Sequence, residues 1–376
     1  MVAVSSAAPV PPRRRTRLST RATLGRLLAA LAVAVVAVLA GPAVPASAHT
    51  VSGAGGQDYV TLLGPLTPAV PGVTVRVVEN GSRLALRNTT GQQVVVLGYD
   101  AEPYLRVGPD GVFENTLSQA TYVNRDRYGG QTGGSVDAAT LPPQWRRTGG
   151  GPTVYWHDHR AHNMRSDLPP SVRARPGLRQ VVQTSDVEIA VGGAVHRAHV
   201  ELVYLPPPPS WPWWLLGAGL AAGTALLALP RRWPALLALA TVGLVSADAV
   251  HSVGIGLDKA GTTGERLAAF AAGNAAEGVA WVLGLVGAVL LLRRSLAGPY
   301  VAATAAAVVA IVGGYGDVGI LSSSTAPFVG PALWARVLTA VSLGVGAGML
   351  GACALTVRRL DREEGRARRD DVVPAA

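Results

Sequence analysis

The pattern of apolar and polar positions divides the chain into two unlike halves. After residue 210, five apolar stretches are each about as long as the 20 residues that a helix needs to cross a bilayer. These stretches are residues 211–229, 234–255, 267–292, 299–321 and 331–356. The pattern therefore predicts an all-α membrane domain of five transmembrane helices over residues 211–356, followed by a charged tail over residues 357–376.

The half before residue 206 has a different period. Short alternating or β-branched runs are separated by turn dipeptides such as Asn80-Gly81 and Asp110-Gly111, which is typical of an all-β domain. The runs are residues 73–78, 84–87, 93–99, 104–107, 153–157, 179–184, 187–191 and 194–204. We expect an immunoglobulin-like or cupredoxin-like β-sandwich over residues 49–205. Residues 128–151 are predicted to form a long loop, and the prolines of 206–210 a hinge to the membrane domain.

Residues 1–48 have the order of a secretory signal peptide. Six arginines and no acid come first, an apolar run over residues 27–40 follows, and Ala46-Ser47-Ala48 forms a small-residue cleavage site. The apolar run is short for a membrane span, so cleavage is favoured over an uncleaved anchor. Cleavage would make His49 the first residue of the mature chain.

Charge changes the picture in two ways. The formal net charge is +10, but removal of the six leader arginines leaves +4, so no nucleic-acid partner is expected. The other marked feature is three arginine pairs, Arg231-Arg232, Arg293-Arg294 and Arg358-Arg359. All three fall on one side of a five-span topology, which the positive-inside rule assigns to the cytoplasm. We expect a multi-pass cell-membrane protein with an extracytoplasmic N-terminal domain and a cytoplasmic C-terminus.

Five ionisable side chains interrupt the predicted spans: Asp248, His251, Glu277, Asp317 and Arg336. Each needs a partner or an aqueous cavity, because a charge facing lipid costs several kcal/mol. All lie near the middle of the membrane or in its outer half, so we expect one polar cluster that faces the exported domain. It is interpreted as an ion relay, a transition-metal site or a cofactor pocket, or else as a charge-paired network that fixes helix packing.

A histidine-rich segment carries the chemistry of the exported half. His157 and His159 would project from one face of a strand, and His162 and Met164 follow closely. Three of the seven histidines thus fall within six residues. Imidazole suits copper and zinc, and thioether suits Cu(I). The other interpretation is a hydrogen-bonded strand end in which Asp158 and Arg160 pair with neighbours.

His49 supports copper over zinc. A mature N-terminal histidine offers its α-amine and its imidazole to one ion, a chelate that favours Cu(II). We therefore predict a metal site built from His49, His157, His159, His162 and Met164. His196 and His199 would point to opposite faces of one strand and are interpreted as surface residues.

The layout resembles the periplasmic copper-handling proteins of the CopC and CopD type. That resemblance implies a small β-sandwich, beginning with a copper-binding histidine at the position of His49, joined to a multi-span membrane domain. The Asp-x-His element of that family is not present in that spacing, because Asp158 and His159 are adjacent. The His-Asp-His-Arg motif and the stretch from Asn88 to Tyr99 also resemble uncharacterised actinobacterial exported membrane proteins.

These features predict an exported, membrane-anchored protein that binds or handles a transition metal, copper before zinc. The competing class is a non-metal cell-envelope protein whose β-domain docks a partner for interaction or assembly. An enzyme comes third, because the sequence has no nucleophile and base pair, no phosphate loop and no dinucleotide fingerprint.

Overall fold

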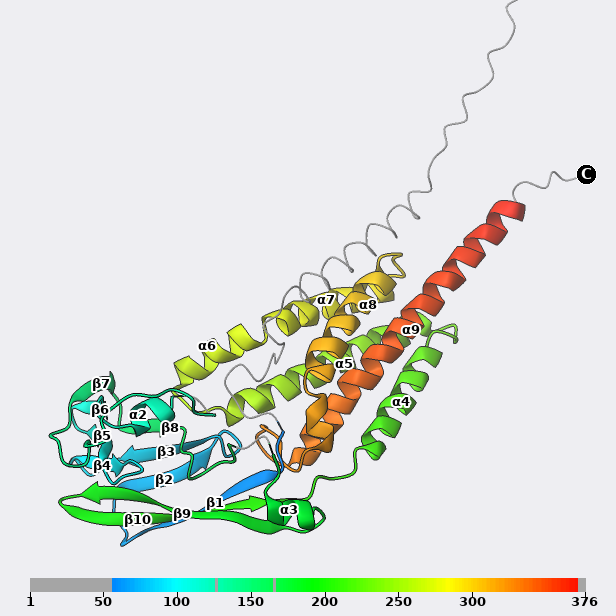
Figure 1. Ribbon diagram of the computed structural model, residues 1–376. Coiled ribbons are helices and arrows are strands. Elements are labelled where there is room, and N and C mark those ends of the chain that lie inside the picture. Colours follow the sequence, from blue (N-terminus) through cyan, green and yellow to red (C-terminus); the bar gives the residue numbers. More distant parts are fainter. Residues whose placement is uncertain (1–55, 126–127, 165–166, 371–376) are drawn as a thin grey trace, which may run out of the picture.

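The computed structural model describes residues 56–125, 128–164 and 167–370. The predicted signal peptide, 1–48, and His49 lie outside the described residues. A β-sheet domain lies at one end of a bundle of helices, and the last helix ends far from it (Figure 1). The division into a β half and a helical half is therefore confirmed.

The β-domain has ten strands in two antiparallel sheets. The strands are β1 Tyr59–Thr67, β2 Val73–Val78, β3 Arg83–Asn88, β4 Val94–Leu97, β5 Pro103–Gly108, β6 Gly111–Asn115, β7 Trp145–Gly149, β8 Thr153–Trp156, β9 Gln180–Val191 and β10 Ala194–Tyr204. The larger sheet has the order β1-β10-β9-β4-β5-β6-β7, and the smaller has the order β2-β3-β8. Two short helices, α2 Ala120–Val123 and α3 Pro170–Ala174, lie between strands.

The two sheets share one hydrophobic core. Leu84 and Leu86 of the smaller sheet and Val96 and Ile189 of the larger are fully buried in the same cluster. Exposure alternates along β4 and β8, because successive side chains of a strand point to opposite faces. The alternation seen in the sequence thus buries one face of each sheet against the other.

Three strands were not predicted, and each has a physical reason. β1 contains Gly64-Pro65, which looks like a strand breaker, but a register shift between Leu63 and Leu66 accommodates it. β6 is short, and β7 lies inside the region expected to be a loop. β7 is polar and pairs only with β6 at the edge of the sheet, where no hydrophobic alternation is needed. The runs 179–184 and 187–191 form one strand, β9.

The helical half comprises α4 Trp211–Leu226, α5 Trp233–Asp258, α6 Thr263–Gly273, α7 Ala275–Leu292, α8 Gly298–Val308, the π-helix η1 Val309–Tyr315, the 3₁₀ helix η2 Val318–Ser322 and α9 Ala332–Asp370. Among the described residues, four helices are long and apolar enough to span a membrane: α5, α7, α8 continued through η1, and α9. The first predicted span corresponds to α4, which has 16 residues.

Two predicted spans are interrupted. The stretch 267–292 is divided at Asn274, whose backbone leaves the helical conformation between α6 and α7. The stretch 299–321 changes from α-helix to π-helix at Val309 and then to 3₁₀ helix after Asp317. By contrast, α9 runs without a break from the last apolar stretch into the charged tail.

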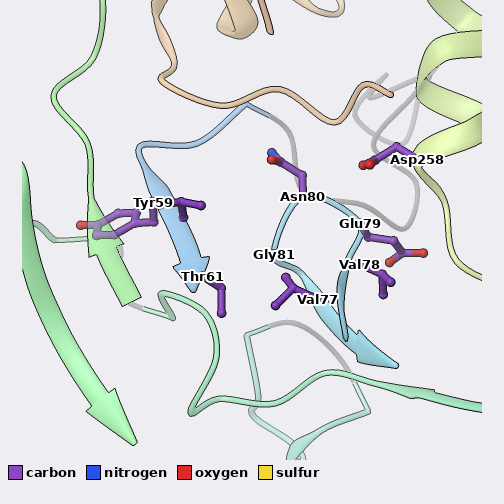
Figure 2. Close-up of a pocket in the computed structure, with 9 residues that line it drawn as sticks. Tyr59, Thr61, Val77, Val78, Glu79, Asn80, Gly81 and Asp258 are labelled. Carbon is purple, nitrogen blue, oxygen red and sulfur yellow. The ribbon is translucent and has the colours of Figure 1, made fainter. Parts of the chain in front are cut away.

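The β-domain touches the membrane domain through the turn between β2 and β3. The Glu79 carboxylate accepts a hydrogen bond of 3.0 Å from the backbone N–H of Ala260, which follows α5. The Asn80 side chain donates to the Thr325 hydroxyl at 3.1 Å. Figure 2 shows this turn beside Asp258, around a hollow of ≈ 240 Å³. The β-domain and the helices therefore form one hydrogen-bonded assembly.

Helix α7 packs closely against α8 at a glycine, and substitutions of the α7 glycines can test this contact. A side chain at Gly287 would come within 2.8 Å of the backbone nitrogen of Ala302 in α8, whereas Gly278 has open space around its Cα. We expect Gly287→Leu to lower the thermal unfolding temperature of the detergent-solubilised protein, because overpacking costs about 1–3 kcal/mol. Gly278→Leu on the same helix should unfold like the wild type. Equal unfolding temperatures for the two variants would contradict the α7–α8 interface described here.

Candidate functional site

The histidine segment follows β8 directly. β8 ends at Trp156, so His157 and His159 lie in the turn after the strand and not on one strand face as expected. Trp156 pairs with Leu84 in β3, close to the β2–β3 turn that touches the membrane domain. The segment therefore begins on the side of the β-domain that faces the helices.

The His162 ring contacts both of the other histidine rings of the segment. Its ring centre is 5.3 Å from that of His159 and 6.1 Å from that of His157. His162 is buried, while His157 and His159 are half-buried. The structure thus brings together three of the side chains that the sequence predicted as ligands.

The orientation of His157 is set by the β2–β3 turn. Its Nδ1 lies 2.8 Å from the carbonyl oxygen of Ser82. Because a carbonyl only accepts hydrogen bonds, Nδ1 carries the proton and Nε2 of the neutral ring carries the lone pair. Metal-bound histidines are held in the same way, with the second ring nitrogen donating to a carbonyl.

Tyr99 and Met164 complete the surroundings of His159. The Tyr99 ring stacks on His159 at 6.3 Å, and its hydroxyl accepts a hydrogen bond from the His159 backbone N–H at 3.1 Å. Gly129 lies against both His159 and Met164: an added Cβ would be 3.0 Å from His159 Cε1 and 3.2 Å from Met164 Cε. Met164 is therefore a neighbour of the histidine group.

Asp158 does not point at the histidines but forms a buried ion pair. Arg160 binds its carboxylate through Nε and Nη2, both at 2.9 Å, and the Trp156 indole N–H donates to it at 2.9 Å. Burial alone would raise the pKa of this carboxyl. The hydrogen bonds and charge of Arg160 outweigh that effect and hold the pKa below its usual value of 3.8. The pairing of Asp158 and Arg160 that the sequence suggested is thus present, next to the clustered histidines.

The histidine rings are almost as close together as the rings of a metal site, but their side chains do not surround one shared position. Within residues 56–125, 128–164 and 167–370, no three His, Cys, Asp or Glu side chains already surround a common metal position. Two imidazoles bound to one ion at about 2.0 Å have ring centres about 5 Å apart. The His159–His162 spacing meets that distance, and the His157–His162 spacing exceeds it by about 1 Å on the same basis.

The remaining histidines of the β-domain have partners outside this group. His196 Nδ1 lies 2.7 Å from the Pro68 carbonyl oxygen, and His199 Nδ1 lies 2.9 Å from Asp186. His199 is well exposed. These contacts agree with their interpretation as surface residues.

Four of the five predicted intramembrane residues gather in one region. His251 Nε2 lies 3.0 Å from Asp317 Oδ2, and the Trp281 indole N–H donates to Asp248 at 2.7 Å. Glu277 interacts electrostatically with both Asp248 and Asp317. Asp248 is ten residues, or about 15 Å of helix, from the end of α5 that meets the β-domain. We call Asp248, His251, Glu277 and Asp317 the intramembrane cluster.

Arg336 has a different role. Its guanidinium donates to the carbonyl oxygens of Ile320, Ser323 and Ser324 at 3.3, 2.6 and 3.1 Å. Ser324 in turn donates to Asp58 of the β-domain through its backbone N–H at 2.9 Å. Arg336 therefore supports the loop on which the β-domain rests.

Sequence reasoning missed several neighbours of these sites. Trp281 is four residues after Glu277 and so shares its helix face, a signal that was present in the sequence. Phe328 stacks on His251 at 6.0 Å, and Ser82 holds His157. Both contacts join distant parts of the chain, and no local pattern indicates them.

The chain matches no protein-family model, no curated protein and no solved structure. Its function must therefore be argued from the residues themselves.

The buried Asp158 carboxylate gives a pH-dependent prediction. Its folded pKa lies below the unfolded one, so its contribution to stability is complete above about pH 4 and is lost as the pH falls through the folded pKa. Asp158→Asn should cost about 3–5 kcal/mol at neutral pH, because it leaves the Arg160 charge buried and unpaired. The variant should also lose part of the acid sensitivity of unfolding.

Urea unfolding of the solubilised protein, followed by tryptophan fluorescence over a pH series, measures both effects. Asp110→Asn is the matched control, because Asp110 pairs with Arg106 but its side chain is 51% exposed. That pair should contribute no more than about 1 kcal/mol. Similar losses of stability in the two variants would contradict the structural role of Asp158.

Proposed function

We propose that the protein is an exported, membrane-anchored binder of a transition metal, copper before zinc. The metal would be held by His157, His159 and His162, with Met164 at the edge of the site. The observation that carries the proposal is that the His162 ring packs edge-on against both other rings, with ring centres 6.1 and 5.3 Å apart. A shift of about 1 Å in the turn that carries His157 would bring the His157–His162 spacing to the value expected for two imidazoles on one ion.

Two further features support this site. The Ser82 carbonyl holds His157 in the tautomer in which Nε2 carries the lone pair, as in metal-bound histidines. Met164 supplies a soft sulfur, which suits Cu(I) and would let the site keep copper after reduction. Among first-row divalent ions, imidazole sites also bind Cu²⁺ most tightly.

The proposed topology follows from charge. Residues 1–48 would act as a signal peptide, and α4 would join the four long helices as a fifth, short span. Arg231-Arg232 and Arg293-Arg294 belong to the α4–α5 and α7–α8 connections, which lie at the end of the bundle away from the β-domain (Figure 1). In α9, Arg359 donates to the carbonyl oxygen of Leu229, just before the first of these pairs, at 3.3 Å. With those arginines in the cytoplasm, the β-domain, of immunoglobulin-like or cupredoxin-like type, would face outward. His49 would then become a mature N-terminus able to add an amine and an imidazole to the site.

The test is a metal titration of the full-length protein. The protein is first solubilised in detergent and stripped of metal. Cu(II), Cu(I) and Zn(II) are titrated by calorimetry against the wild type and against His157→Ala, His159→Ala and His162→Ala. Each variant should lose at least about tenfold in copper affinity, because the loss of a supporting contact alone typically costs 10–100-fold. His162→Ala should lose the most, since its ring touches both others.

His199→Ala is the matched control, because His199 is an exposed histidine of the same domain that pairs with Asp186. Its copper affinity should equal that of the wild type. If all three segment variants bound copper as tightly as the wild type, the proposal would be wrong. The surviving function would then be the alternative, a non-metal envelope module that docks a partner through its β-domain.

A further inference from the structure

A second polar site lies within the helices, apart from the histidine segment. The intramembrane cluster combines three carboxyl groups and one imidazole from three parts of the bundle. Asp248 and His251 belong to α5, Glu277 belongs to α7, and Asp317 follows the π-helix. Asp248, His251 and Glu277 are completely buried, and Asp317 is 7% exposed.

The acidic excess among the described groups of this cluster favours a cationic ligand. With all groups ionised, three carboxylates would face one imidazolium, leaving a net negative charge where hydration is absent. Of the described helices, α4 and α8 contain no charged residue, and the one basic residue of α6, Arg266, interacts with Asp258. From α9, the guanidinium of Arg336 goes to backbone carbonyls instead.

Two buried oxygens show where such a ligand fits. Asp248 accepts the Trp281 N–H through Oδ2, but its Oδ1 has no hydrogen-bond partner among the described residues. Ser342 of α9, also fully buried, lies next to the same carboxyl, yet its hydroxyl meets no described partner in hydrogen-bond geometry. A buried oxygen without a partner costs about 1–3 kcal/mol. A hydrogen on Oδ1 directed at the Ser342 oxygen would give both oxygens a partner and also remove the carboxylate charge, which rotation of the Ser342 hydroxyl alone would not do.

The helix break brings the backbone close to this oxygen. The π-helix η1 precedes Asp317, and such bulges occur frequently at functional sites. At Gly313 within it, a Cβ would come 2.1 Å from Asp248 Oδ1. Glycine is thus the residue that lets the π-helix lie against the carboxyl, and no larger side chain separates them.

We propose that the intramembrane cluster is a proton-binding site, with the proton held on Asp248 Oδ1 beside Ser342. A proton fits because it neutralises charge without needing the several ligands that a metal ion takes. The proposal is independent of metal binding by the histidine segment.

The test uses the full-length protein in lipid nanodiscs and infrared difference spectra recorded across a pH series. A protonated carboxyl group has a carbonyl band that its ionised form lacks. The wild type should show this band weakening as the pH is raised and returning as it is lowered. In Asp248→Asn the band should be missing, although the amide oxygen can still accept from Trp281.

Two further variants make the result specific. Ser342→Ala should retain the band but shift its frequency, because the neighbouring hydroxyl is removed. Glu363→Gln is the control, since Glu363 is an exposed acid, 58% accessible, on the distal part of α9, and its spectra should match the wild type. Equal thermal unfolding temperatures would show that Asp248→Asn folds normally.

Three results would overturn the proposal. If the wild type and Asp248→Asn gave the same spectra at every pH, Asp248 would carry no proton. A band that does not change with pH would mean a permanently neutral, structural carboxyl. A band that sodium, potassium or zinc ions remove at constant pH would make the cluster a metal-cation site.

Discussion

The contact between the β2–β3 turn and the membrane domain is the constraint on which the arrangement of the molecule depends. Glu79 and Asn80 both adopt left-handed backbone conformations, with φ of 54° and 50°. This is uncommon for residues other than glycine and unfavourable for glutamate. The conformation is held by the Arg83–Glu79 ion pair and by the Ala260 N–H. Docking to the helices thus helps to fix the turn.

The same turn positions the proposed metal site. Ser82 is its last residue before β3, and the Ser82 carbonyl orients His157. On the other side of the contact, Ser324 bonds to Asp58, and the loop that carries Ser324 is held by Arg336. This loop follows η2, the short helix that begins after Asp317. The histidine segment and the intramembrane cluster are therefore attached to the two sides of one interface, although each would bind its own ligand.

The sequence predicted what depends on local periodicity and little of what depends on long-range contact. Alternation located β4 and β8, because each buries every second side chain against the other sheet. Spacing predicted that Asp248 and His251 share a helix face, and clustering singled out His157, His159 and His162. The break at Asn274, the π-helix before Asp317 and the bulge at Gly64-Pro65 left no periodic signal, since each is set by packing against other elements. The pairing of His251 with Asp317 likewise depends on how α5 meets a distorted helix 66 residues later.

The central claim is that three clustered imidazoles bind one copper ion. X-ray absorption spectroscopy of the copper-loaded, full-length protein tests it directly, because imidazole rings give a characteristic multiple-scattering pattern. We expect two or three imidazole nitrogens at about 2.0 Å from copper, and one fewer in His162→Ala. A copper environment without imidazole scattering, or one that is identical in the wild type and His162→Ala, would contradict it.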